Sequence, residues 1–158
     1  MTNLKARVAP EFEGISGWIN SGALNLHDLR GKVVFLDFWT YGCSNCQRTL
    51  PSVRELHSKY SSRGLVVVGV HTPEFAYETK RENVEKAVAA AGLSYPIALD
   101  SENLTWKLYG NHYWPRQILV DAEGRIRYEH VGEGDYDTIE AKVVELLNEV
   151  AKVRLTTD

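Results

Sequence analysis

The two cysteines of this chain, Cys43 and Cys46, lie where a predicted buried strand meets a predicted helix. Residues 33–38 before them are apolar apart from Asp37, which is typical of a strand inside a sheet. Residues 47–61 after them repeat apolar side chains at helical spacing. The first sulfur is therefore expected at a helix N-terminus, where free N–H groups and the helix dipole stabilise a thiolate. The second sulfur is one turn further along, so the pair can close a disulfide and suits thiol–disulfide exchange.

Two other interpretations of the pair are weaker. A structural disulfide across two intervening residues would restrict little of the unfolded chain. A structural zinc site needs four Cys or His ligands, but there is no second cysteine pair, and His71, His112 and His130 are scattered singly. A Gly-x-Gly-x-x-Gly motif is also absent. We therefore expect a redox-active Cys43–Cys46 disulfide as the only cofactor, with no metal and no nucleotide.

The size and charge of the chain narrow the classes of function. Its 158 residues are enough for one domain with a substantial core. The net charge of −3 comes from interspersed acids and bases, which gives no surface for nucleic acid. No apolar stretch approaches the roughly 20 residues of a membrane span. Because residues 1–7 lack the apolar core of a signal peptide, we expect a cytoplasmic protein if this is the full chain. We expect an extracytoplasmic one if it is a domain excised from an exported or membrane protein.

The order of the predicted elements indicates an α/β fold. Residues 1–13 show no periodicity and are expected to form an irregular lead, whereas residues 14–158 are expected to form a single domain. Strands alternate with helices until a closing hairpin, which predicts a mixed sheet flanked by helices. The polar segment 74–81 is interpreted as an insertion with a solvated face that includes Glu78, Lys80 and Arg81. The expected strands are 24–26, 33–38, 65–70, 95–99, 117–121 and 125–131, and the expected helices are 47–61, 82–91, 104–109 and a last helix through 139–153.

Several residues stand at the spacing found in the thioredoxin superfamily, and the chain resembles that superfamily. Asp37 lies six residues before Cys43, Pro51 lies in the helix that follows, and Trp114-Pro115 precedes an apolar strand. The resemblance implies a thioredoxin fold, in which a central mixed sheet is flanked by helices. Here the fold would carry an N-terminal extension and an insertion after the second core strand.

A closer similarity is to the thioredoxin-like domain of DipZ proteins, which are relatives of the TlpA/ResA group. The similarity runs from about Ala9 to about Leu147 and implies a thiol–disulfide oxidoreductase. One position departs from thioredoxin itself. Gly42 replaces the tryptophan that usually precedes the first cysteine, so one aromatic wall of the partner-binding surface is absent. The motifs that carry the similarity are residues 38–41, 69–74, 94–100, 113–115 and 132–136.

The predicted catalytic roles divide between the two cysteines and one acid. Cys43 is the expected nucleophile because it comes first, at the exposed helix end, where its pKa is lowered. Cys46 is one turn deeper and is the expected resolving thiol. Burial of Asp37 in an apolar strand is expected to raise its pKa and make it a proton acceptor for Cys46. The alternative is that Asp37 points to solvent at a strand edge.

The substrate-binding surface is expected around the cysteine pair and the loop that ends at Pro115. The resemblance implies a cis Trp114–Pro115 bond, which turns the Trp114 backbone outward for β-type pairing with a substrate peptide. An ordinary trans proline at an edge strand is the alternative, and core packing alone would also explain Trp39. The predicted substrate-binding residues are Trp39, Tyr41, Gly42, Ser44, Asn45, Trp114 and Pro115.

Two further functions stay open at this point. Thr40, three residues before Cys43, is compatible with a peroxiredoxin-like peroxidase, but Leu36 stands where that family has a proline. The other alternative is a non-catalytic binding module with a vestigial cysteine pair, against which the joint presence of both cysteines, Asp37 and Pro115 argues. We expect a monomer that exchanges disulfides with protein substrates and with a protein electron donor or acceptor, without nucleic acid and without a membrane span.

Overall fold

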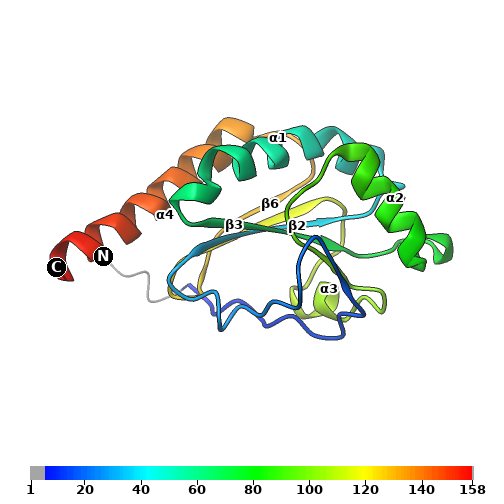
Figure 1. The fold of residues 1–158 in the computed structure, drawn as a ribbon, viewed down its shortest axis with the longest axis horizontal. Helices are drawn as coiled ribbons and strands as arrows, with labels where there is room; N and C mark the ends of the chain where they lie inside the picture. The colour runs from blue at the N-terminus through cyan, green and yellow to red at the C-terminus, as the bar shows by residue number, and fades with distance from the viewer. Residues whose placement is uncertain (1–5, 158) are drawn as a thin grey trace.

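The central strand of the sheet leads directly to the cysteine pair. The structure is a computed structural model that describes residues 6–157 (Figure 1). Strand β2 covers Val33–Trp39, and helix α1 covers Ser44–Tyr60 after a short turn. The other elements are β1 (Trp18–Ile19), β3 (Leu65–His71), α2 (Arg81–Ala91), β4 (Ile97–Leu99), α3 (Leu104–Leu108), β5 (Arg116–Val120), β6 (Ile126–Val131) and α4 (Tyr136–Thr157), with 3₁₀ turns at Ser61–Arg63 and Ala76–Thr79.

The described strands form one mixed sheet in the order β1-β4-β3-β2-β5-β6. β2 pairs in parallel with β3, and β3 pairs in parallel with β4, as expected for strand–helix–strand units. β5 pairs antiparallel with the other edge of β2, and β6 pairs antiparallel with β5. This is the α/β arrangement, with a closing hairpin, that the sequence predicts.

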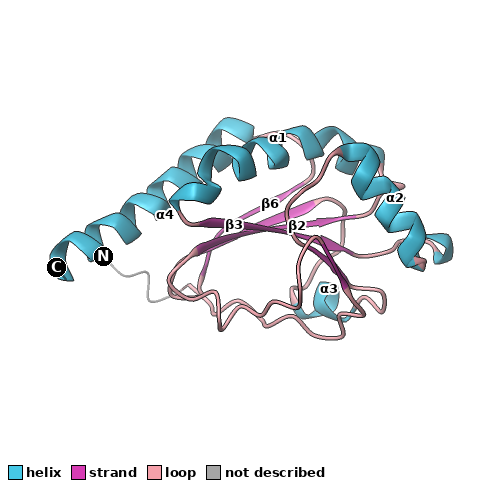
Figure 2. Cartoon of the chain, in the orientation of Figure 1, coloured by secondary structure: helices cyan, strands magenta, loops and turns pink. Residues whose placement is uncertain are grey.

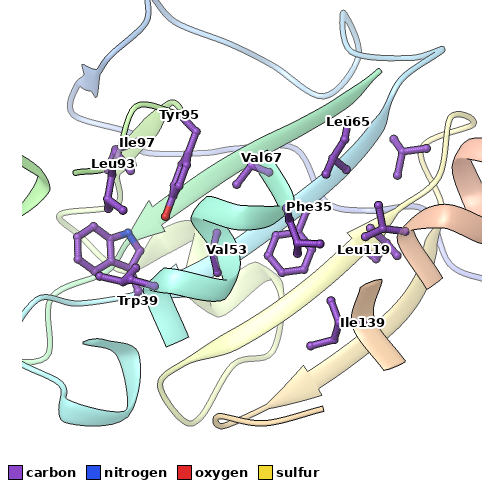
Figure 3. Close-up of a cluster of buried hydrophobic side chains, with 14 of the residues drawn as sticks. Phe35, Trp39, Val53, Leu65, Val67, Leu93, Tyr95, Ile97, Leu119 and Ile139 are labelled. Carbon is purple, nitrogen blue, oxygen red and sulfur yellow. The ribbon is translucent and has the colours of Figure 1, made fainter. Parts of the chain in front are cut away.

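Helices and loops cover the sheet on both faces. α1, α2 and α4 lie on one face, and α3 lies on the other face with the N-terminal loops (Figure 2). Phe35 and Trp39 of β2 pack in the layer under α1, which Figure 3 shows, whereas Leu36 and Phe38 pack on the opposite side. Every residue of β2 is buried, which explains why the strand is apolar along nearly its whole length. By this alternation Asp37 belongs to the layer under α1.

The strand predicted at residues 24–26 does not form. The Leu26 and His27 N–H groups donate instead to the Glu11 carboxylate, at 2.7 and 3.1 Å. The edge strand is β1, where Trp18 and Ile19 pair antiparallel with β4. A strand of two residues has no alternation that a sequence pattern can detect, and its pairing partner lies far along the chain.

The described part of the predicted irregular lead is packed against the domain. Val8 forms an isolated antiparallel bridge with Arg125. Ala9 and Phe12 are buried in the layer on the α3 side of the sheet. Residues 1–5 of the lead lie outside the described residues.

A buried acid, Asp100, ties the end of β4 to α3 and to the end of β3. Its carboxylate accepts the Thr105 and Trp106 N–H groups at 3.0 and 2.9 Å, and the Thr72 hydroxyl at 2.8 Å. The side chain is fully buried, so these donors have no water to bond instead. Trp106, placed in this way, stacks on Trp114 with ring centroids 4.0 Å apart. Asp100 therefore supports the loop that borders the cysteine pair.

We expect Asp100→Ala to lower the free energy of unfolding by about 3 kcal/mol, because it leaves buried donors unsatisfied. Urea unfolding followed by circular dichroism measures this as a lower midpoint at an unchanged slope. Glu102→Ala removes an exposed acid nearby and should change stability by less than about 0.5 kcal/mol. Equal losses in the two variants would contradict this role of Asp100.

Candidate active site

Cys43 is the N-cap residue of α1, at the point where the chain leaves the turn after β2. Its backbone is extended, with φ −96° and ψ 119°, and its sulfur accepts a hydrogen bond from the Cys46 N–H at 3.2 Å. The residue is only partly buried, so a partner can reach it. The helix N-terminus favours negative charge at this place. Cys43 thus lies where the nucleophile of a thiol–disulfide exchange is needed.

Cys46 lies one turn further along α1 and is buried. Both cysteines are free thiols in this structure. Burial raises the pKa of the Cys46 thiol, and its hydrogen bond with Cys43 and the nearby charge of Asp37 raise it further. Such a thiol stays protonated at neutral pH and needs a base before it can attack a disulfide.

Asp37 supplies a carboxyl group close enough for its charge to act on Cys46. It is 1 % exposed, which excludes the alternative in which it points to solvent. Burial raises the pKa of Asp37 to about 7, and the polar side chain of Gln117, directly opposite on β5, acts in the other direction. A carboxyl group with this pKa exchanges protons readily at neutral pH, which is the property that a general base for Cys46 needs.

The loop before β5 forms the other side of the site. The peptide bond between Trp114 and Pro115 is cis. The Trp114 carbonyl oxygen lies 4.0 Å from the Cys43 sulfur, so the backbone here borders the nucleophile. The Trp114 ring is engaged inside the protein, because its Nε1 donates to the Thr72 carbonyl at 2.9 Å and its face stacks on Trp106. A partner therefore meets the backbone of Trp114 more than its ring.

Around Cys43, the small residues are exposed, whereas the aromatic residues pack against the protein. Tyr41 is half-buried and stacks on His71 with ring centroids 5.6 Å apart. Trp39 is fully buried in the core layer, so the prediction that it binds substrate is wrong. Its side chain is directed from β2 toward the helices, and packing is its role. Three predicted binding residues are exposed around the nucleophile: Gly42, Ser44 and Asn45.

His71, at the end of β3, holds this turn and was not assigned to the site from the sequence. Its Nε2 accepts the Tyr41 N–H at 3.3 Å and lies 3.3 Å from the Thr40 hydroxyl. Burial lowers the pKa of His71 to about 4, so the ring is neutral at neutral pH and can accept. The Thr40 hydroxyl, which a peroxidase site would need beside Cys43, is engaged with this imidazole.

Glu78 is the second residue that sequence reasoning missed, and its predicted place on a solvated face is wrong. The side chain is 1 % exposed. Its carboxylate accepts the Gly42 N–H at 3.1 Å and the Glu74 and Phe75 N–H groups at 2.7 and 3.0 Å. The available signal was the glycine before the first cysteine, which leaves room for a side chain from elsewhere. The two basic residues of the same segment, Lys80 and Arg81, are exposed as predicted.

The site thus combines a reachable thiol at a helix N-terminus, a buried second thiol and a buried acid. Within residues 6–157, no three or more His, Cys, Asp or Glu side chains gather closely enough to hold a metal ion. The sheet order, the helix layers and the position of the cysteine pair define a thioredoxin-fold protein with a Cys-x-x-Cys redox site.

Comparison with known proteins supports this class. The chain matches the Redoxin family over residues 8–147, and it belongs to that family. It is 49% identical over 144 residues to protein DipZ of Mycobacterium bovis, a match that covers 89% of this chain and 21% of DipZ. It is 34% identical over 102 residues to the thiol-disulfide oxidoreductase ResA of Geobacillus thermodenitrificans, which covers 65% of this chain and 56% of ResA. The chain spans about a fifth of the length of the DipZ proteins that it matches.

A solved structure shows the same fold. The crystal structure of a thiol:disulfide interchange protein, DsbE from Chlorobium tepidum, matches with a TM-score of 0.80 and 30% identity, over 90% of this chain and 97% of that chain. The predicted thioredoxin fold is therefore confirmed, and so is the resemblance to the ResA and DipZ group. These relatives and the Cys43-x-x-Cys46 pair support thiol–disulfide oxidoreductase activity.

We expect Asp37→Asn to stabilise the protein at alkaline pH. The folded-state pKa of Asp37, about 7, lies above the ordinary value of 3.8, so the free energy of unfolding falls as the pH rises through this window. Asparagine does not ionise, so the variant avoids that loss. Its free energy of unfolding should exceed that of the wild type by up to about 4 kcal/mol near pH 8 and should differ little near pH 4. Urea unfolding at both pH values tests this. A stability difference that does not change with pH would contradict the raised pKa.

Proposed function

We propose that this domain reduces or exchanges disulfides of protein substrates through a mixed-disulfide intermediate. The observation that carries the proposal is the asymmetry of the two sulfurs. Cys43 is partly exposed at the N-terminus of α1, whereas Cys46 is buried one turn further in, with a raised pKa. Ordered exchange needs one thiol that meets the partner and a second that attacks only afterwards.

The first step is attack of the Cys43 thiolate on one sulfur of the substrate disulfide. The substrate S–S bond breaks, a bond forms between Cys43 and the substrate, and the other substrate sulfur leaves as a thiolate that takes a proton. In the second step the Cys46 proton passes to the Asp37 carboxylate, and the Cys46 sulfur attacks Cys43. The bond between Cys43 and the substrate breaks, and the second substrate sulfur leaves as a thiolate that takes a proton. The substrate thus leaves with both sulfurs reduced, and this protein, which has lost two electrons, carries a Cys43–Cys46 disulfide.

The partners in this proposal are proteins on both sides of the exchange. A protein electron donor reduces the Cys43–Cys46 disulfide again, and a protein acceptor serves exchange in the opposite direction. That disulfide is the only redox group that the cycle needs, and the domain acts as a monomer. Among residues 6–157, none of the helices has the length and apolar character to pass through a membrane.

The proposed substrate surface lies between the exposed turn residues and the Trp114 loop. Gly42 and Ser44 leave the approach to Cys43 open. The Trp114 carbonyl, 4.0 Å from the Cys43 sulfur, offers an acceptor for an extended substrate segment. Pairing of this kind uses the substrate backbone, so it suits varied protein substrates.

We expect Cys46→Ser to accumulate a mixed disulfide with a protein substrate such as insulin, because nothing resolves the bond to Cys43. Non-reducing electrophoresis and mass spectrometry detect the adduct and its position. Cys43→Ser is the matched control and should form none. Failure of the wild type to reduce insulin with dithiothreitol as electron source would refute the proposed function.

The same cycle predicts a kinetic effect of Asp37→Asn. We expect resolution of the mixed disulfide at neutral pH to slow by about 100-fold, because Cys46 loses its proton acceptor. The first attack by Cys43 should change little. Rapid-mixing experiments with a labelled disulfide separate the two steps, and an unchanged resolution rate would exclude Asp37 as the base.

A further inference from the structure

The turn that presents the nucleophile is held by side chains from a distant segment. The Tyr41 N–H donates to His71 Nε2 at 3.3 Å, and the Gly42 N–H donates to Glu78 Oε2 at 3.1 Å. Of these three N–H groups, only that of Cys43 bonds within the turn, where it donates to the Thr40 carbonyl at 3.3 Å. The two outside partners come from the end of β3 and the 3₁₀ turn that follows. The backbone leading into Cys43 is therefore placed by tertiary contacts.

The Glu78 carboxylate joins two backbone segments through its two oxygens. Oε1 accepts the Glu74 and Phe75 N–H groups at 2.7 and 3.0 Å, and Oε2 accepts the Gly42 N–H. A carboxylate has only acceptor sites, so it matches a cluster of N–H donors. The residue is 1 % exposed, and these hydrogen bonds offset the free-energy cost of burying its carboxylate. Glu78 is thus a buried carboxylate, and one of its two oxygens bonds the turn that carries Cys43.

Space, and not backbone conformation, favours glycine at residue 42. Its φ is not positive, unlike that of many other glycines of the chain. A Cβ at Gly42 would overlap Glu78 Oε2 and would lie 3.2 Å from the Tyr77 hydroxyl. The direction that a side chain at residue 42 would take is therefore occupied by an acid from another segment.

We propose that Glu78 is a positioning residue for Cys43, which fixes the Gly42–Cys43 peptide through the Gly42 N–H and requires glycine at residue 42. The proposal rests on the proposed function only in taking Cys43 as the attacking thiol. Removal of the carboxylate frees the peptide immediately before the helix N-terminus. The Cys43 sulfur then loses its fixed relation to the Cys46 N–H, which it accepts at 3.2 Å.

The segment that carries Glu78 also contacts the opposite wall of the site. The Thr72 carbonyl accepts Trp114 Nε1 at 2.9 Å, and the Tyr77 carbonyl accepts the Tyr41 hydroxyl at 3.1 Å. Residues 72–78 therefore link the turn before Cys43 to the loop whose carbonyl borders it. Through these contacts Glu78 sets the nucleophile relative to the substrate-binding backbone.

The test is the reactivity of Cys43 in Glu78→Gln, measured as the rate of alkylation by iodoacetamide across a range of pH. Glutamine has one acceptor oxygen and one donor nitrogen, so it cannot accept from both backbone segments. We expect the rate at neutral pH to fall about tenfold, with a displaced pH midpoint and retained circular dichroism. The matched control is Glu74→Gln, which removes an exposed charge from the same segment and should stay within about twofold of the wild type. A lower melting temperature with unchanged alkylation rate and pH midpoint would show a purely structural role and overturn the proposal.

A second variant tests the contact from the other side. Gly42→Ala keeps Glu78 but inserts a methyl group where its carboxylate lies, so it should also slow alkylation about tenfold. In a Glu78→Ala background the space is free, and the same change should have little further effect. Equal losses in both backgrounds would mean that the two residues act independently, and the proposal would fail. Because alkylation needs no disulfide substrate, its outcome is separate from whether the wild type reduces insulin.

Discussion

The burial of β2 on both of its faces is the constraint on which the rest of the site depends. The whole of Val33–Trp39 is buried. The chain therefore becomes exposed only in the turn that follows, just before α1 begins. A helix start needs an acceptor for its unpaired N–H groups, and the Cys43 sulfur supplies one. The strand that builds the core thus also places the reactive sulfur at the edge of the sheet.

The same burial determines how the two buried acids behave. Cys46 and Asp37 are each 1 % exposed, and burial raises the pKa of each. Each charge disfavours the other, so a single negative charge is more stable there than two. Transfer of a proton from Cys46 to the Asp37 carboxylate moves the negative charge to the sulfur. The pair therefore carries one negative charge both before and after the transfer. The apolar core therefore provides a chemical environment that a surface pair of the same residues would not have.

The segment after β3 shows where local pattern stops being informative. Its polar composition predicts a solvated face, and for Lys80 and Arg81 that prediction holds. Glu78 is buried instead, because three backbone N–H groups converge on it. Two of these donors are nearby in sequence, but the third, on Gly42, is 36 residues away. Nothing in the local pattern distinguishes this acid from its exposed neighbours.

The sequence by itself determined the strand and helix around the cysteines and the order of the main elements, and it favoured an inward place for Asp37, which its 1 % exposure in the structure then established. These follow from periodicity and from the cost of burying charge, which act on short stretches of chain. The tertiary structure alone decided the two-residue strand β1, the full burial of Trp39 and the contact of Glu78 with Gly42. Each of these depends on a partner far along the chain, and such a partner becomes a neighbour only when the sheet and its layers have assembled.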